Sequence, residues 1–344
     1  MFALVDCNNF YASCERVFQP QYEGKAVVIL SNNDGCVIAR SNEAKALGIP
    51  MGAPAFKFQN EFKKHNIKVF SSNYPLYGDM SNRVMKILET YTPKVEIYSI
   101  DEAFLKFEGF DHFDLKTTGL KMRTQVRRWT GIPVSVGMAP SKALAKIANK
   151  IAKKFDQRTQ GVYCIDSDEK RLKALKWTPI EDVWGVGRQH AKRLQAIGVS
   201  TALDFVLLPD EWVKKHMSVL GLRLKKDLEG TPSIQLEEAS APKKSIATTR
   251  SFKNILTIYS DLEERITTYT LLGAEKLRKQ KSCATALHVF VRSNPFDPKA
   301  VQYRNGCTLT LPYATDSNFV LNRYALMGLS SIFKSEIEYK KVGV

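Results

Sequence analysis

The stretches Asp6-Cys7-Asn8-Asn9-Phe10-Tyr11 and Ser99-Ile100-Asp101-Glu102-Ala103 carry most of the information in this chain of 344 residues. Each follows an apolar run that is typical of a β-strand, at residues 2–5 and 95–98. Carboxylates beside apolar walls are costly to bury unless a cation pairs with them. If the two stretches meet in space, three carboxylates converge on one point, which is how proteins hold two divalent metal ions for phosphoryl transfer.

The order of elements in the first half predicts that the two stretches do meet. We expect a broken βαββαβ pattern, with strands at 2–5, 95–98, 103–107 and, as the last one, 133–137, and with helices at 10–18, from 79 onward and at 115–129. A loop-rich insert with a turn at Asn32-Asn33-Asp34-Gly35 interrupts the pattern. In a split βαβ sheet, strand one lies antiparallel beside strand three. Asp6 then lies beside Asp101 and Glu102.

An amphipathic helix is predicted from Ser141 to Lys154, with Ser141 as a good N-cap. One side of this helix carries four lysines: Lys142, Lys146, Lys150 and Lys153. A lysine stripe is usually a solvated face. This stripe directly follows the last strand of the acidic sheet, so it is either a solvated face or a surface that meets phosphates.

The segment Val183-Trp184-Gly185-Val186-Gly187-Arg188, followed by Ile197-Gly198-Val199, resembles a helix-hairpin-helix element. Its glycines permit a tight turn whose backbone N–H groups point outward at a helix N-terminus, where an anion is stabilised. Such elements hold the DNA backbone without reading the base sequence. The alternative is a plain pair of helices joined by glycine turns.

Residues 243–344 repeat the βαββαβ pattern and carry 16 Lys and Arg against 8 Asp and Glu. We expect strands at 245–253, 285–292, 307–311 and 336–342, a helix at 260–280 opened by a capping box of Ser260 and Glu263, and a helix at 318–333. Residues 231–242 read as a linker. In the second strand His288, Phe290 and Arg292 face outward, which suits a nucleic-acid groove but also an ordinary solvated sheet face.

The overall composition agrees with a polyanionic partner. Lys and Arg number 51 against 35 Asp and Glu, so the formal charge is +16. Nucleic acid is the commonest partner of so basic a chain, and the alternative is a basic enzyme without one. The six cysteines form no paired motif and the five histidines do not cluster, which argues against a zinc site or a disulfide framework. With no leader pattern and no apolar run of membrane-spanning length, we expect a cytoplasmic protein without a membrane partner.

Together these motifs resemble those of the Y-family of translesion DNA polymerases, and within it the UmuC-type catalytic subunits of bacterial DNA polymerase V. The resemblance covers the whole chain. It rests on DCNNFYASCE at 6–15, CVIARSNEAKALGIPMG at 36–52, YSIDEAFL at 98–105, SVGMAPSKALAKIANKIAKK at 135–154 and the hairpin element. Several dispersed motifs in one order are far more specific than any one alone.

The resemblance implies an α+β multidomain fold shaped like a right hand. The palm, a ferredoxin-like βαββαβ unit, would comprise 1–18 and 76–166, and small fingers would occupy 19–75. A helical thumb at 167–230 would contain the helix-hairpin-helix. After the linker at 231–242, a βαββαβ little finger that binds DNA would span 243–344.

The implied reaction is DNA-templated, low-fidelity translesion synthesis during SOS-type damage tolerance, without proofreading. A deoxynucleotide is transferred from a dNTP to a primer 3′-hydroxyl with the help of two Mg²⁺ ions. Asp6 and Asp101 would flank both ions, Glu102 would lie nearer the primer, and the backbone carbonyl of Cys7 would be a further ligand. Mg²⁺ prefers oxygen ligands, which suits carboxylates here.

The resemblance also implies the substrate contacts. Tyr11 matches the steric gate that rejects a 2′-hydroxyl, and its alternative is a core aromatic residue. The other implied nucleotide contacts are Phe10, Ile38 with Ala39, Ser41, Asn42, Lys45 and Lys153. Many family members carry Tyr and Arg where Asn42 and Lys45 stand, and Lys lacks the bidentate fork of Arg. The implied DNA contacts are Gly185, Gly187, Arg188, Arg250 and Arg292.

The implied partners are primer-template DNA, a UmuD′-type accessory dimer, RecA and the sliding clamp, in the cytoplasm of a bacterium beside the nucleoid. No clamp-binding peptide is found in this sequence. Three other functions use related parts. A nucleotidyl cyclase would need no template, a non-catalytic DNA-binding protein would lack a carboxylate, and a structure-specific nuclease would degrade DNA without nucleotides.

Overall fold

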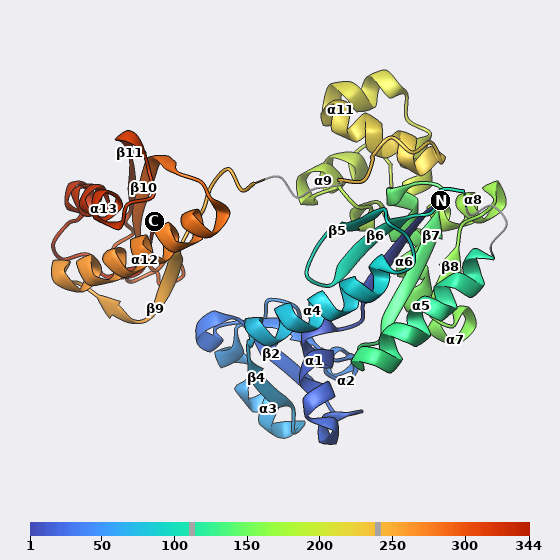
Figure 1. Cartoon of the computed structure of the whole chain (residues 1–344), viewed down its shortest axis with the longest axis horizontal. Helices are drawn as coiled ribbons and strands as arrows, with labels where there is room; N and C mark the ends of the chain where they lie inside the picture. The colour runs from blue at the N-terminus through green and yellow to red at the C-terminus, as the bar shows by residue number, and fades with distance from the viewer. Residues whose placement is uncertain (110–113, 238–241) are drawn as a thin grey trace. The chain divides into compact units, whose positions relative to one another are not determined.

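The structure, a computed structural model, describes residues 1–109, 114–237 and 242–344. The chain divides into two compact units, Met1–Ala239 and Ser240–Val344, which Figure 1 shows in blue to yellow and in orange to red. The division falls inside the linker that we predict at 231–242. Residues 238–241 of that linker lie outside the described residues. Within the described ranges, no helix is long and apolar enough to cross a membrane.

The first unit is built on a five-stranded sheet in the order β5-β6-β1-β7-β8 (Figure 1). Its strands are β1 (Phe2–Cys7), β5 (Val95–Ile97), β6 (Glu102–Lys106), β7 (Val134–Ala139) and β8 (Val162–Cys164). Strand β1 pairs antiparallel with β6, as predicted, and also with β7. The prediction that the sheet ends at the fourth strand is wrong, because β8 follows and pairs parallel with β7.

Helices cover both faces of this sheet. Helices α1 (Phe10–Phe18), α4 (Tyr74–Glu89) and α5 (Leu115–Thr130) share one core with Ala3 and Val5, whereas α6 (Lys142–Lys154) shares another with Phe2 and Leu4. Successive side chains of β1 enter opposite cores because a strand points them alternately to its two faces. Helix α4 begins five residues before the predicted Asp79, because Asn73 caps it by accepting a hydrogen bond from the Leu76 amide at 3.3 Å.

Helix α6 lies unusually close to β7 at one glycine. A Cβ atom on Gly137 would lie 2.0 Å from the amide nitrogen of Asn149, so only glycine fits there. The Asn149 side chain donates to the carbonyls of Leu4 at 3.2 Å and Ser135 at 2.8 Å. These contacts fix the lysine-bearing helix against the strand that carries Asp6.

The insert between α1 and α4 has a small core and a three-stranded sheet of its own, which the sequence did not reveal. Its strands are β2 (Val27–Leu30), β3 (Val37–Arg40) and β4 (Lys68–Ser71), in the order β3-β2-β4. The short helical pieces are η1 (Pro20–Tyr22), η2 (Asn32–Asp34), α2 (Asn42–Ala46), η3 (Ala55–Lys57) and α3 (Gln59–Lys64). The predicted turn is η2, where Asn33 has a φ of 63°.

Six further helical segments follow β7 and α6 in the described part of the first unit. They are α7 (Asp156–Thr159), α8 (Asp168–Trp177), η4 (Ile180–Asp182), α9 (Arg188–Gln195), α10 (Ala202–Val206) and α11 (Asp210–Glu229). The tight turn predicted between η4 and α9 is present, with Gly185 at a φ of +85° and Gly187 as the N-cap of α9. The first arm of the hairpin is only the short η4.

The second unit is an antiparallel four-stranded sheet covered by two helices. Its sheet order is β11 (Arg304–Thr315), β10 (Ala284–Ser293), β12 (Tyr339–Gly343) and β9 (Thr249–Leu256). Helices α12 (Tyr259–Gln280) and α13 (Asn318–Ile332) pack on the face that carries Leu287, Val289 and Val291. The predicted capping box is wrong. The helix begins at Tyr259, one residue before the predicted start, and its N-cap Ile258 makes no side-chain hydrogen bond. The rings of Tyr259 and Phe333 pack together with centroids 5.2 Å apart.

Candidate active site

The sheet register brings two of the three predicted carboxylates together and places the backbone of the third next to them. Asp6 on β1 is directly opposite Glu102 on β6, and the Cys7 amide donates to the Asp101 carbonyl at 2.8 Å. The Ser99 hydroxyl donates to Asp101 Oδ1 at 2.7 Å and accepts from the Glu102 amide at 3.0 Å. The turn between β5 and β6 is therefore tied to the carboxylates themselves.

Two lysines of α6 form ion pairs with Asp6 and Glu102. Lys153 Nζ lies 2.5 Å from Asp6 Oδ2, and Lys146 Nζ lies 2.8 Å from Glu102 Oε2. The other two lysines also pair with acids, since Lys142 contacts Glu96 and Lys150 contacts Asp182. All four predicted lysines thus form ion pairs, so in this structure the stripe is not simply a solvated face.

Burial sets the electrostatics of the two paired carboxylates. Burial raises the pKa of Asp6 to about 7, although the Lys153 ammonium opposes the rise. Burial also acts to raise the pKa of Glu102, but hydrogen bonds from Lys146 and Asp6 outweigh it and the pKa is lowered. Burial thus disfavours the ionised form of Asp6 even beside Lys153, and a further cation at this position would favour that form.

The donors fit Mg²⁺ in kind, since they are carboxylate oxygens. In the described parts of the chain, however, no three His, Cys, Asp or Glu side chains are arranged so that they could hold a metal ion. Lys153 and Lys146 each contact one carboxylate oxygen, of Asp6 and of Glu102. A metal ion bound through those two oxygens would displace the lysines.

Tyr11 of α1, the predicted steric gate, packs against two tyrosines of α4. The half-buried ring of Tyr11 stacks on Tyr77 with centroids 4.3 Å apart and contacts Tyr74 edge-on at 6.1 Å. Tyr77 is held in turn by a buried hydrogen bond from its hydroxyl to Glu15 at 2.7 Å. Phe10 is only 4% exposed and belongs to the core, so it supports this group from within.

The residues predicted to contact the triphosphate divide into two groups. Lys45 Nζ donates to Asn9 Oδ1 at 2.5 Å, and the Asn9 amide donates to Asn42 at 2.9 Å. Burial lowers the pKa of Lys45, and the charges of Arg40 and Lys153 lower it further, which indicates a cluster of cations. Sequence reasoning missed Asn9 and Arg40, although both stand in the quoted motifs.

The other predicted nucleotide contacts lie in structural positions. The fully buried Ser41 hydroxyl accepts from the Val27 and Ala44 amides, so it caps α2 and closes the small sheet. Ile38 and Ala39 lie half-buried on β3. Cys7 is buried, and burial raises the pKa of its thiol well above its usual range.

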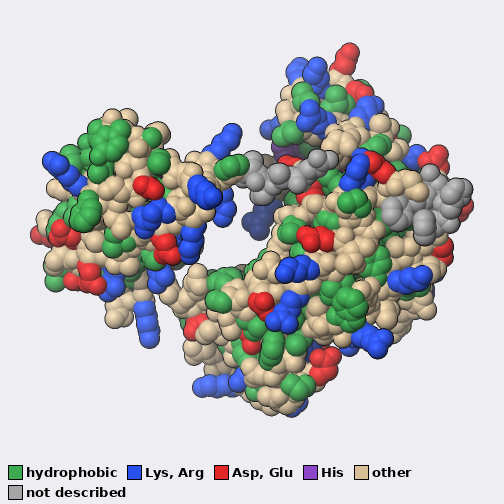
Figure 2. Space-filling model, viewed as in Figure 1, with side chains coloured by type: hydrophobic (Ala, Val, Ile, Leu, Met, Phe, Trp, Pro, Cys, Tyr) green, Lys and Arg blue, Asp and Glu red, His purple; other side chains and the backbone are tan. Residues whose placement is uncertain are grey.

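The predicted DNA contacts are divided between the two units. In the first unit Gly185 and Gly187 shape the turn, and Arg188 is exposed at the start of α9. Trp184 in this turn was missed, and its Nε1 donates to the Tyr98 hydroxyl at 3.0 Å. Figure 2 shows Lys and Arg side chains spread over the visible face of both units.

In the second unit the register separates the two predicted arginines. Arg292 is opposite Arg304 on one side and Lys341 on the other, which makes a row of three cations on the face away from the helices. Arg250 is opposite the buried Val342, and its guanidinium lies 6.0 Å from the Tyr269 ring of α12. Arg250 therefore belongs to the helix-covered side. Sequence reasoning missed Arg304 and Lys341.

Comparison with known proteins places this geometry in a family. The sequence matches the impB/mucB/samB family over residues 5–150 and the C-terminal domain of that family over residues 243–344. The chain belongs to the impB/mucB/samB family. It is similar to the protein UmuC of Salmonella typhimurium, with 43% identity over all of this chain and 82% of that protein. It is also similar to ImpB of Salmonella typhimurium, with 41% identity, and to MucB of Escherichia coli, with 37%, at the same coverage of both chains.

Solved structures agree on the fold of this member of the family. A Y-family DNA polymerase chimera of Dbh and Dpo4 superposes with a TM-score of 0.81 at 21% identity, over 100% of this chain and 97% of the chimera. An insertion ternary complex of Dbh DNA polymerase superposes with a TM-score of 0.62. The predicted α+β right-hand fold is confirmed, and so is the prediction that the chain is a Y-family DNA polymerase of the UmuC translesion type.

Proposed function

We propose that this polymerase copies damaged DNA with low fidelity and without proofreading, by transferring a deoxynucleotide from a dNTP to a primer 3′-hydroxyl. The observation that carries the proposal is the pairing of Asp6 with Glu102 across β1 and β6, with Asp101 tied to the same turn. Two Mg²⁺ ions bound there would activate the primer hydroxyl and stabilise charge on the leaving pyrophosphate. The burial of Asp6, whose ionised form a bound cation would stabilise, supports this role for the carboxylates.

The residues around the carboxylates would bind and orient the nucleotide. Tyr11, fixed against Tyr77, would lie under the sugar and leave no room for a 2′-hydroxyl. Lys45, Arg40 and Lys153 would neutralise the triphosphate, since their charges already influence one another. Lys153 would exchange Asp6 for a phosphate oxygen when the nucleotide enters. The assigned ligand role of the Cys7 carbonyl, and the roles of Phe10, Ile38, Ser41 and Asn42, remain part of the proposal.

DNA would be held through its backbone on both units. The N-terminus of α9, with Gly185, Gly187 and Arg188, offers amide donors to a phosphate. The row of Arg304, Arg292 and Lys341 carries three like charges side by side, which is unfavourable unless an anion covers it. The UmuD′-type dimer, RecA, the sliding clamp and a place beside the bacterial nucleoid belong to the same proposal.

Primer extension tests this function. The chain should extend a primer on undamaged and abasic templates with Mg²⁺ and dNTPs, and Asp101→Ala and Glu102→Ala should each abolish extension while primer-template affinity stays within about twofold. Parallel loss of binding would indicate a structural role for these carboxylates. Product formed without a template would favour the cyclase reaction, and degradation of DNA without nucleotides would favour the nuclease.

A further inference from the structure

A buried acidic residue of α1 bonds to the tyrosine on which Tyr11 stacks. Glu15 is only 7% exposed, and its carboxyl group accepts a hydrogen bond from the Tyr77 hydroxyl at 2.7 Å. In the part of the chain that the structure describes, no Lys, Arg or His forms an ion pair with Glu15. A carboxyl group buried without an ion pair costs stability. The hydrogen bond to Tyr77 is therefore the interaction that offsets this cost.

Helix α1 holds the Tyr77 side chain at two points. Tyr11 and Glu15 are four positions apart, so they lie on the same face of the helix. The Tyr77 ring stacks on the Tyr11 ring with centroids 4.3 Å apart and planes inclined by 16°, while its hydroxyl reaches Glu15. Burial raises the pKa of Tyr77, and the bond to Glu15 raises it further, so the hydroxyl remains a donor. Contacts at the ring face and at the hydroxyl together fix the plane of the Tyr77 ring.

Tyr74, one turn earlier on α4, adds a second support for the Tyr11 ring. It lies edge-on to Tyr11 with centroids 6.1 Å apart and planes at 87°, and edge-on to Tyr77 at 6.2 Å and 80°. Stacked and edge-on pairs are the arrangements that aromatic rings prefer. Tyr77 is fully buried, whereas Tyr74 is 41% exposed. The rings of α4 therefore define where the Tyr11 ring lies, and Glu15 is the polar contact that fixes the buried one.

We propose that Glu15 is a positioning residue for the steric gate: through Tyr77 it fixes the Tyr11 ring, and so it sets how strictly ribonucleotides are rejected. This inference rests on the proposed role of Tyr11. A gate of this kind excludes a single hydroxyl group, and a displacement of about 1 Å in an active site is enough to change rates strongly. A Tyr77 ring that has lost its bond to Glu15 supports Tyr11 less firmly and leaves more room for a 2′-hydroxyl.

The test measures kcat/KM for single-nucleotide insertion with matched dNTP and rNTP, and takes their ratio. Glu15→Leu leaves the Tyr77 hydroxyl without its acceptor, so the ratio should fall about fivefold, the factor that corresponds to one hydrogen bond. Tyr77→Phe breaks the same bond from the other side and should lower the ratio to a similar extent. Glu15→Gln keeps an acceptor oxygen, and its ratio should stay within about twofold of that of the unchanged chain.

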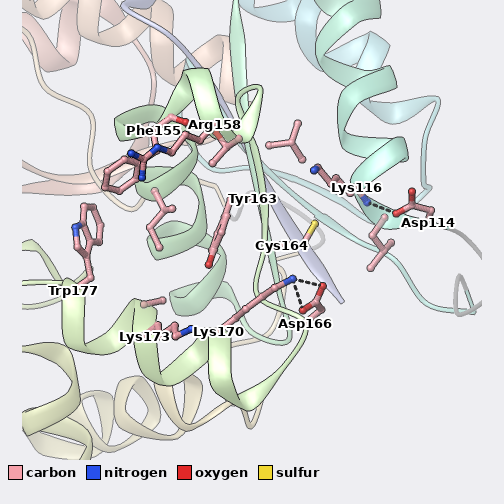
Figure 3. Close-up of a pocket in the computed structure, with 15 residues that line it drawn as sticks. Asp114, Lys116, Phe155, Arg158, Tyr163, Cys164, Asp166, Lys170, Lys173 and Trp177 are labelled. Atoms are coloured by element: carbon pink, nitrogen blue, oxygen red, sulfur yellow. Dashed lines mark hydrogen bonds and ion pairs between the residues drawn. The ribbon is translucent and has the colours of Figure 1, made fainter.

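Two control variants separate positioning from stability. Met85→Ala removes a buried side chain from the core that contains Tyr77, so it should lower the unfolding temperature and leave the ratio unchanged. Tyr163→Phe removes a tyrosine hydroxyl at a cavity of about 740 Å³ beside β8, which neither Glu15 nor Tyr77 lines (Figure 3). Its ratio should also be unchanged. A ratio that falls in Met85→Ala as far as in Glu15→Leu would overturn the proposal, because destabilisation alone would then explain the effect.

Combining Glu15→Leu with Tyr11→Ala tests whether Glu15 acts through the gate. Once the Tyr11 ring is gone, Glu15→Leu should cause no further fall in the ratio. The proposal is overturned if Glu15→Leu leaves the ratio unchanged while Tyr11→Ala lowers it, or if Glu15→Leu lowers the ratio equally with and without the Tyr11 ring. If Tyr11→Ala itself leaves the ratio unchanged, the proposed gate is wrong and this inference is wrong with it.

Discussion

The indole Nε1 of Trp184 donates a hydrogen bond to the hydroxyl of Tyr98 at 3.0 Å, across 86 positions of sequence. The Tyr98 ring lies 4.5 Å from the Lys146 ammonium, which itself pairs with Glu102 at 2.8 Å. The turn proposed to hold DNA is therefore two side chains away from a proposed catalytic carboxylate. These contacts connect the turn to the active site through Tyr98 and Lys146.

Removing this hydrogen bond should slow nucleotide insertion while leaving DNA binding largely intact. In Trp184→Phe the ring remains but the donor is lost, so kcat should fall about fivefold, which corresponds to one hydrogen bond of about 1 kcal/mol. Tyr98→Phe should have the same effect, and the double variant should be no slower than either single variant. Trp212→Phe, in α11, is the matched control. Additive losses in the double variant would show that the two residues act separately.

Lys142 and Glu96 form a buried ion pair, and removing one partner alone should strongly destabilise the first unit. Lys142 is 2% exposed and lies 2.7 Å from Glu96, which also accepts from the Glu237 amide at 2.9 Å. Lys142→Met should lower the free energy of unfolding by about 3–5 kcal/mol, because it leaves a buried carboxylate unpaired. Urea unfolding measures this loss, with Lys154→Met at the exposed end of α6 as the control. Lys142→Met/Glu96→Leu should recover most of it, and a single-variant loss below about 1 kcal/mol would contradict the account.

Tyr11 should control the choice of sugar. Tyr11→Ala removes the ring that is held against Tyr77 and opens space under the ribose, so discrimination between dNTP and rNTP should fall by at least about tenfold. Single-nucleotide insertion with matched dNTP and rNTP measures the ratio. Tyr22→Ala, a change to another partly buried tyrosine of the same unit, should leave the ratio unchanged. If Tyr11→Ala also leaves it unchanged, Tyr11 is only a packing residue.

The two arginines of the second unit should differ in how they affect DNA binding. Arg292 stands in the row with Arg304 and Lys341, whereas Arg250 lies over Tyr269 on the helix side. Arg292→Ala should reduce the slope of log affinity against log salt by about 0.9, the value for one lost phosphate contact on duplex DNA. Arg250→Ala should leave that slope unchanged. Equal slopes for both variants would mean that the outer row does not face the DNA backbone.

Local patterns in the sequence predicted the centre of the site well. The pairing of Asp6 with Glu102 follows from strand order alone, and the helix at Phe10–Phe18 was predicted with its observed bounds. The alternation that placed His288, Phe290 and Arg292 outward likewise predicted the buried face of β10, which carries Leu287, Val289 and Val291. These features depend on short-range periodicity and on a small choice of sheet topologies.

Contacts between distant segments were beyond such patterns. The bond between Trp184 and Tyr98, and the row that adds Arg304 and Lys341 to Arg292, depend on how elements pack and on registers interrupted by bulges. The small sheet of the insert was missed because its strands have only four residues each. Ser260 looked like a helix cap, but packing of Tyr259 moved the helix start.

The most direct test of the proposed two-metal site is the number of divalent ions that the chain binds. Mn²⁺ should be titrated onto the chain with a dideoxy-terminated primer-template and the next correct dNTP, and the bound ions counted by electron paramagnetic resonance. The account predicts two ions per chain above those held by DNA and nucleotide alone, and fewer in Asp6→Asn and Asp101→Ala. The same number of bound ions in these variants as in the unchanged chain would contradict it.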